Sequence, residues 1–209
     1  MKRLTLLFQL TVAVVAALAF AAPAHAAAAE RSTSDVRTFA SGAAVAGASS
    51  SLTRTGSGVS VSLRTTGLSA GDAVTVWWVV FNHPEACDGM AGSPFRCAET
   101  DLFNPAVAAS VQYAGGRIVG ESGNYTVGSY LGEGDRAGCP FGADLCAGLI
   151  DSHEADVHFV VRSHGPALAE YLPGQIKSFG GACGNVPEEL GGGGPNTCAD
   201  LQFSVHETL

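Results

Sequence analysis

Residues 73–81 read AVTVWWVVF, a run composed almost entirely of β-branched and aromatic residues. Such a run is typical of a central β-strand whose two faces are both covered. Because consecutive strand residues point to opposite faces, Trp77 and Trp78 cannot both face the main core. One indole is therefore expected under a loop, in a second apolar layer or at a ligand surface. We take Trp78, together with Asp101, as candidate ligand contacts of a carbohydrate-active protein.

Three further segments alternate apolar and polar residues, as half-buried strands do. Their expected inward residues are Val59, Val61 and Leu63, then Val157, Phe159 and Val161, then Leu201, Phe203 and Val205. In the last segment, Gln202, Ser204 and His206 are expected to face outward. Helical periodicity is nearly absent, and the 27 glycines indicate many turns. We predict an all-β fold, an antiparallel β-sandwich or a barrel-like variant, over residues 52–209, preceded by a flexible segment at 27–51.

The N-terminus carries the pattern of an export signal. Lys2 and Arg3 precede an apolar run over residues 4–22, and Ala24-His25-Ala26 supplies a signal-peptidase site. We expect a signal peptide over residues 1–26 with cleavage after Ala26; a retained membrane anchor is the alternative. No later stretch of the sequence is apolar enough to span a bilayer, so a soluble extracellular product is expected. The net charge of -8, without a basic run, argues against nucleic acid as a partner.

All six cysteines follow the signal, and they fall into local couples within Gly/Pro-rich loops: Cys87/Cys97, Cys139/Cys146 and Cys183/Cys198. An even number of cysteines in an exported chain indicates disulfides. Other pairings are formally possible, but the distribution favours these local ones. The alternative, a zinc or iron–sulfur site, lacks the C-x-x-C spacing typical of such sites. The long loops should therefore be held in fixed shapes, and rigid loops are where binding sites usually lie.

Histidines are the candidate metal ligands. His158 and His164 share the polar face of the strand predicted at 156–162 and its extension, and imidazole suits copper and zinc. Six residues of straight strand span about 20 Å, so only a bend near Ser163 would bring these two rings to one ion. The third ligand could be His83, His153 or His206. The alternative is a polar face of solvated or hydrogen-bonded histidines, with no cofactor.

Three segments carry a resemblance to known proteins: WWVVFN at 77–82, DLFNPA at 101–106 and VVRSHGP at 160–166. They are similar to segments of an uncharacterised family of secreted bacterial proteins. More loosely, the Gly67-Leu68 turn and the later strand with His158 resemble CHRD (chordin-type) β-sandwich domains. The H-x-H pair often seen there stands here as Asp156-Val157-His158, which also counts against a copper–zinc superoxide dismutase. The resemblance implies a fold and export, and no reaction.

These features together predict a secreted, non-enzymatic binding or envelope-associated protein whose ligand is not identified. The alternative is an extracellular copper- or zinc-binding protein, or a metal-dependent oxidoreductase, that uses the histidine-bearing strand. No catalytic residues are assigned, because no free cysteine is expected once the disulfides form and the chain contains no nucleotide-binding glycine loop.

Overall fold

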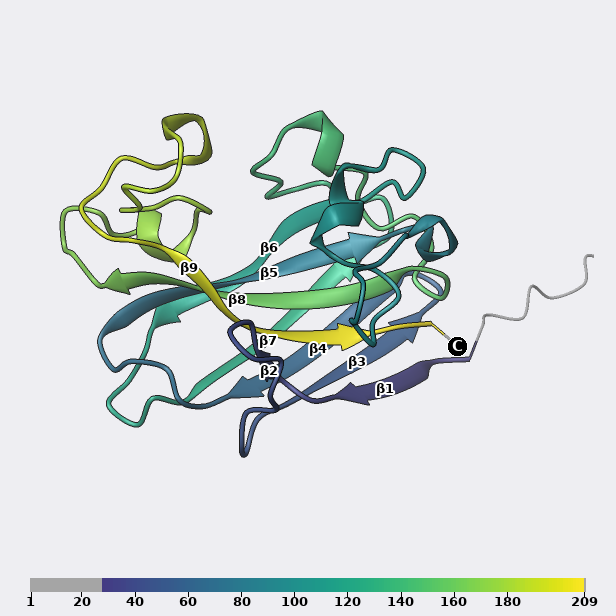
Figure 1. Ribbon diagram of the computed structural model, residues 1–209, viewed down its shortest axis with the longest axis horizontal. Helices are drawn as coiled ribbons and strands as arrows, with labels where there is room; N and C mark the ends of the chain where they lie inside the picture. The colour runs from purple at the N-terminus through teal and green to yellow at the C-terminus, as the bar shows by residue number, and fades with distance from the viewer. Residues whose placement is uncertain (1–27, 209) are drawn as a thin grey trace, which may run out of the picture.

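The computed structural model describes residues 28–208, which form two antiparallel β-sheets packed face to face (Figure 1). One sheet has the strand order β1-β3-β4-β7, and the other has the order β2-β9-β8-β5-β6. The strands are β1 (Glu30–Ser34), β2 (Arg37–Thr38), β3 (Ser49–Thr55), β4 (Gly58–Thr65), β5 (Asp72–Phe81), β6 (Ser110–Ile118), β7 (Tyr125–Gly132), β8 (Asp156–Pro166) and β9 (Ala199–His206). Short 3-10 helices cover Pro84–Ala86, Glu99–Phe103, Ala143–Leu145, Gly174–Ile176 and Glu188–Leu190, and the described residues include no α-helix. The predicted β-sandwich is confirmed, in its open rather than its barrel form.

The main core lies between the two sheets. On β4 the residues Val59, Val61 and Leu63 are buried while the serines between them are exposed, as the alternation predicts. The matching inward residues of β8, Val157, Phe159 and Val161, are also fully buried. Burying each such side chain contributes about 1.5–3 kcal/mol to stability.

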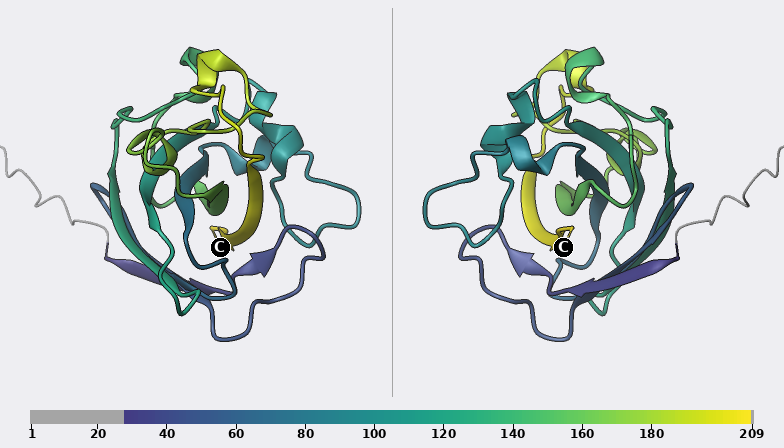
Figure 2. Two further views of the ribbon diagram at one scale, coloured as in Figure 1. Left: turned by 90° about the vertical axis from the view of Figure 1, so that its left-hand side faces the viewer. Right: turned by 90° about the vertical axis from the view of Figure 1, so that its right-hand side faces the viewer.

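The long loops gather on the far side of the five-stranded sheet, away from the four-stranded sheet, and Figure 2 shows these layers end-on (Figures 1 and 2). A second apolar cluster forms there, between the sheet and the loops. Its members from β5 are Trp77, Val79 and Phe81, and its loop members include Cys97 and Leu145. The central strand β5, paired with β6 and β8, is therefore covered on both faces, as predicted.

The N-terminal segment, predicted to be flexible, contains regular strands within residues 28–51. Glu30–Ser34 forms the edge strand β1 on β3, and Arg37–Thr38 forms β2 on β9. Ser49 already begins β3. These edge strands are held by backbone hydrogen bonds, and their side chains are polar and either exposed or half-buried, so no apolar alternation marks them in the sequence.

Over residues 202–206, strand β9 faces the opposite way from the prediction, whereas Leu201 packs against the core between the sheets, as predicted. The polar residues of β9 point into the sandwich: Gln202 Nε2 donates to the carbonyl of Thr66 at 2.9 Å, and His206 bonds the hydroxyls of two serines of the other sheet. Phe203 and Val205 point outward, under the loops. The prediction assumed that apolar residues face the core between the sheets. The outer face of this sheet is also covered, by apolar loop residues, so apolar residues of β9 can be buried there instead.

The three predicted disulfides, Cys87–Cys97, Cys139–Cys146 and Cys183–Cys198, are all present. The predicted signal peptide and its cleavage site after Ala26 lie outside the described residues. Within residues 28–208, no helix has the length and hydrophobicity needed to cross a membrane.

Candidate ligand-binding site

A cavity of about 910 Å³ lies between the outer face of the five-stranded sheet and the long loops, and we call it the sheet–loop cavity. Its floor is the outward side of the strands, because alternate strand residues share one face. The floor residues are Trp77, Val79 and Phe81 of β5, Val111 of β6, His158 and Val160 of β8, and Phe203 and Val205 of β9. All but one of these side chains are apolar.

The walls of the cavity come from separate loops. Residues 90–103 supply one wall, Phe141 and Leu145 of the Cys139–Cys146 loop supply a second, and Phe179 supplies a third. Phe179 is fixed by Arg162, whose guanidinium carbon lies 4.0 Å from the ring centre and whose Nε donates to the Phe179 carbonyl at 3.0 Å. At the rim, the side chains of Phe39, Met90 and Phe103 are exposed to solvent. Large apolar side chains thus reach the opening of the cavity.

Asp101 organises the first wall and does not face the cavity. Its carboxylate oxygens accept backbone hydrogen bonds from Asp88, Gly89 and Ala98 at 2.8, 3.1 and 2.7 Å. The side chain is buried, and the backbone groups that bond its carboxylate lie in or next to the loop closed by the Cys87–Cys97 disulfide. The predicted role of Asp101 as a ligand contact is corrected to that of a loop anchor.

Trp77 and not Trp78 lines the cavity, which corrects the second predicted ligand contact. Trp78 packs between the sheets, with its ring centre 4.6 Å from that of Phe159. Trp77 stands edge-on to Tyr113 and Phe179, at 5.7 and 5.5 Å between ring centres. Its indole N–H donates to Thr75 Oγ1 at 2.7 Å, so the polar end is satisfied and the apolar body is left for the cavity.

His158 is the polar exception in the floor. The side chain is only 9% exposed, and its ring centre lies 4.8 Å from that of Phe81. Its Nε2 atom is buried and has no hydrogen-bond partner in the part of the chain that the structure describes. Burial lowers the pKa of His158 to about 3, and the nearby His206 acts in the same direction. The imidazole is therefore neutral at physiological pH.

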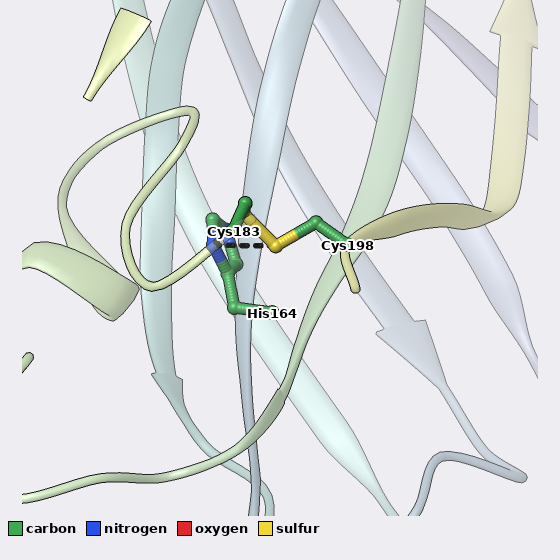
Figure 3. A group of neighbouring side chains, drawn as sticks. All are labelled: His164, Cys183 and Cys198. Atoms are coloured by element: carbon green, nitrogen blue, oxygen red, sulfur yellow. Dashed lines mark hydrogen bonds between the residues drawn. A yellow bond between two sulfur atoms is a disulfide. The ribbon is translucent and has the colours of Figure 1, made fainter. Parts of the chain in front are cut away.

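His164 contacts a disulfide, as Figure 3 shows, and the group resembles a metal site in its composition alone. The sulfur atoms of Cys183 and Cys198 are bonded to each other, so neither is a thiolate ligand. Both ring nitrogens of His164 are also engaged: Nδ1 with the Gly181 carbonyl at 3.0 Å and Nε2 with the Thr75 hydroxyl at 2.8 Å. Burial lowers its pKa to about 4. The group ties the Cys183–Cys198 loop to the sheet.

The predicted histidine cluster is not assembled. His206 lies inside the sandwich, 2.8 Å from the hydroxyls of both Ser32 and Ser50, and burial lowers its pKa to about 4. His83 lies near Glu85, and His153 lies near Glu30. Among residues 28–208, the one group of three metal-type ligands with converging atoms is His164, Cys183 and Cys198. The structure does not bring His158 and His164 to a common point with a third histidine.

Comparisons of the chain with protein-family models, with curated proteins and with solved structures found no match. The resemblance to CHRD domains and to a family of secreted bacterial proteins stays a prediction. The candidate site rests on the geometry of this chain.

The sequence analysis did not predict this cavity, although the residue pattern of β5 indicates an apolar floor. Trp77, Val79 and Phe81 form a second apolar face on the strand whose first face builds the core. That double face predicts an apolar surface under the loops. The walls carry no such signal, because residues such as Met90, Phe141 and Phe179 meet only through the fold.

Proposed function

We propose that the protein is an exported, non-enzymatic binding module that holds an apolar small molecule in the sheet–loop cavity. The observation that carries this proposal is the cavity itself, whose volume of about 910 Å³ falls within the range of small-molecule sites, roughly 300–1,000 Å³. Such sites are mostly apolar with a few placed polar groups, and this floor pairs seven apolar side chains with one histidine.

The loops support a binding role because they are pre-formed. The loops closed by Cys87–Cys97 and Cys139–Cys146 supply cavity-lining residues, and the Asp101 carboxylate fixes the first of them further. The Cys183–Cys198 disulfide belongs to an apolar cluster against which the wall residue Phe179 packs. A wall that is already ordered loses little conformational entropy when a ligand enters. Three disulfides are typical of proteins that work outside the reducing cytosol, which supports the proposed export.

The test is a titration with N-phenyl-1-naphthylamine, an uncharged probe whose fluorescence rises in apolar surroundings. We expect one probe per chain with a dissociation constant near 1 μM, a binding free energy of about -8 kcal/mol. Val160→Trp places an indole in the floor of the cavity and should abolish this binding. Ile150→Trp is the matched control, because Ile150 is exposed and lies outside the cavity lining.

Unfolding curves of both variants show whether the fold is retained. Loss of probe binding in folded Val160→Trp, with retention in Ile150→Trp, supports the proposal. Equal binding by wild type and Val160→Trp, or no binding by wild type, contradicts it.

A further inference from the structure

Among residues 28–208, no group donates a hydrogen bond to the buried Nε2 atom of His158 or accepts one from it. Its partners across the sheet are Val79 on β5 and Val205 on β9, and its ring packs on Phe81. From this placement we propose that His158 is the residue that selects the ligand, by pairing with one uncharged hydroxyl or carbonyl group on an otherwise apolar body. This inference rests on the proposed binding function and adds the chemical class of the ligand.

One ring nitrogen of His158 forms no hydrogen bond within the part of the chain that the structure describes. The buried Nε2 atom has no partner, and a buried polar atom without one costs about 1–3 kcal/mol. His158 belongs to the cavity lining, and the χ2 torsion of histidine is broad and roughly two-fold, so its ring has more than one accessible orientation there. A polar group on a bound ligand would supply the missing partner, and the bond would form in a site shielded from water.

The charged residues that line the cavity indicate which polar group of a ligand could bind beside His158. The neutral imidazole expected at this depth has one donor and one acceptor nitrogen, which suit a hydroxyl or a carbonyl. The described lining residues include the carboxylates Glu99 and Asp200 and no lysine or arginine. Asp200 is already paired with Arg162 at 2.7 Å. A ligand carboxylate would meet no cation on the floor and like charge at the rim, so an uncharged head group is favoured.

Naphthalene, 2-naphthol and 2-naphthoate provide a test, because they share one apolar body and differ in the head group. Calorimetric or fluorescence titrations with each compound are compared for wild type and His158→Phe, which keeps an aromatic ring of similar size against Phe81. We expect wild type to bind 2-naphthol about five- to tenfold more tightly than naphthalene, the ratio that one net hydrogen bond provides. Naphthoate should bind more weakly than naphthol.

In His158→Phe the ratio of naphthol to naphthalene affinity should fall to about one, while naphthalene binding is retained. A ratio that stays unchanged in this variant, or naphthoate binding as tight as naphthol binding in wild type, overturns the assignment of His158 but leaves the cavity proposal standing. Binding of none of the three compounds overturns both.

A second measurement on the wild-type protein does not depend on the folding of the variant. The imidazole ¹⁵N resonances of His158 should shift when 2-naphthol is added and stay near their starting positions when naphthalene is added. Equal shifts with both compounds contradict the proposed hydrogen bond.

Discussion

Trp77 and Trp78 are adjacent in the chain, yet their indoles lie in two separate apolar layers on opposite faces of β5. Trp78 belongs to the core between the sheets, and Trp77 forms part of the sheet–loop cavity. Strand geometry alone requires this separation. It also assigns the two residues different tasks, since one stabilises the fold and the other faces the proposed ligand.

The first prediction separates these tasks. Trp78→Ala removes a fully buried indole from the core and should lower the free energy of unfolding by about 3–5 kcal/mol, measured by chemical denaturation. In the single-tryptophan variant Trp78→Phe, the fluorescence of Trp77 should still change on addition of the naphthylamine probe. In Trp77→Phe, the remaining Trp78 should respond much less. A Trp78 signal that tracks binding as strongly as the Trp77 signal would contradict the assignment of the faces.

A second prediction concerns Asp101. Asp101→Asn replaces one carboxylate oxygen by an amide N–H₂ that faces backbone donors, so at least one of three hydrogen bonds is lost. We expect a loss of about 1–3 kcal/mol in stability and faster amide hydrogen exchange over residues 88–98. Glu99→Gln is the control, because Glu99 is exposed. Equal exchange in both variants would show that Asp101 does not anchor the loop.

A third prediction follows from the buried histidines. Burial lowers the pKa of His158 to about 3 and the pKa values of His164 and His206 to about 4. Unfolded histidines titrate near about 6.5, so the unfolded chain takes up protons first as the pH falls. Stability should be full above about pH 6.5 and fall toward pH 4, by about 2 kcal/mol per histidine at pH 5.

The raised pKa of Asp156, caused mainly by its burial, opposes this trend, since its protonated form is favoured in the folded state. Unfolding free energies at pH 7 and pH 5 check the sign of the net effect. His158→Phe should reduce the difference between the two pH values, whereas His83→Gln, at a half-exposed position, should leave it unchanged. A difference between the two pH values that is as large in His158→Phe as in wild type would contradict the burial of a neutral His158.

A fourth prediction concerns the loop that His164 contacts. The Cys183–Cys198 disulfide spans 15 residues, and the double variant Cys183→Ser/Cys198→Ser should lose about 3 kcal/mol of stability through loop entropy. The Cys139–Cys146 disulfide spans 7 residues, so its double serine variant should lose less. Thermal unfolding of the two variants tests the order. A larger loss of stability in the Cys139/Cys146 variant than in the Cys183/Cys198 variant would indicate that loop entropy does not determine how much each disulfide stabilises the fold.

Sequence patterns identified the fold where one face of a strand is apolar and the other is solvated. The alternation in β4 and β8 predicted their inward residues, and the composition of 73–81 predicted a strand covered on both faces. The same reasoning failed for β9, because Phe203 and Val205 face covering loops, while Gln202 and His206 find hydrogen bonds inside the sandwich. An apolar residue indicates burial, but in a sheet covered on both faces it does not indicate which face the residue lies on.

The candidate site was predicted only in part. The tryptophan pair indicated a second apolar layer, but nothing local in the sequence tells which indole belongs to it. Histidine spacing suggested a metal site, whereas the burial and hydrogen bonds that separate the five histidines depend on strand pairing and bulges. Long-range contacts of this kind are set by tertiary structure, and residue type and spacing do not encode them visibly.

Ligand binding in the sheet–loop cavity is tested most directly by NMR measurement of intermolecular contacts between naphthalene and the methyl groups of the wild-type protein. We predict nuclear Overhauser effects to the methyl groups of Val79, Val160 and Val205, on the floor of the cavity, and none to those of Val59 and Val61 in the core. Contacts confined to exposed side chains outside the cavity, such as Ile150, or no contact at saturating ligand, would contradict the claim that this protein encloses an apolar molecule.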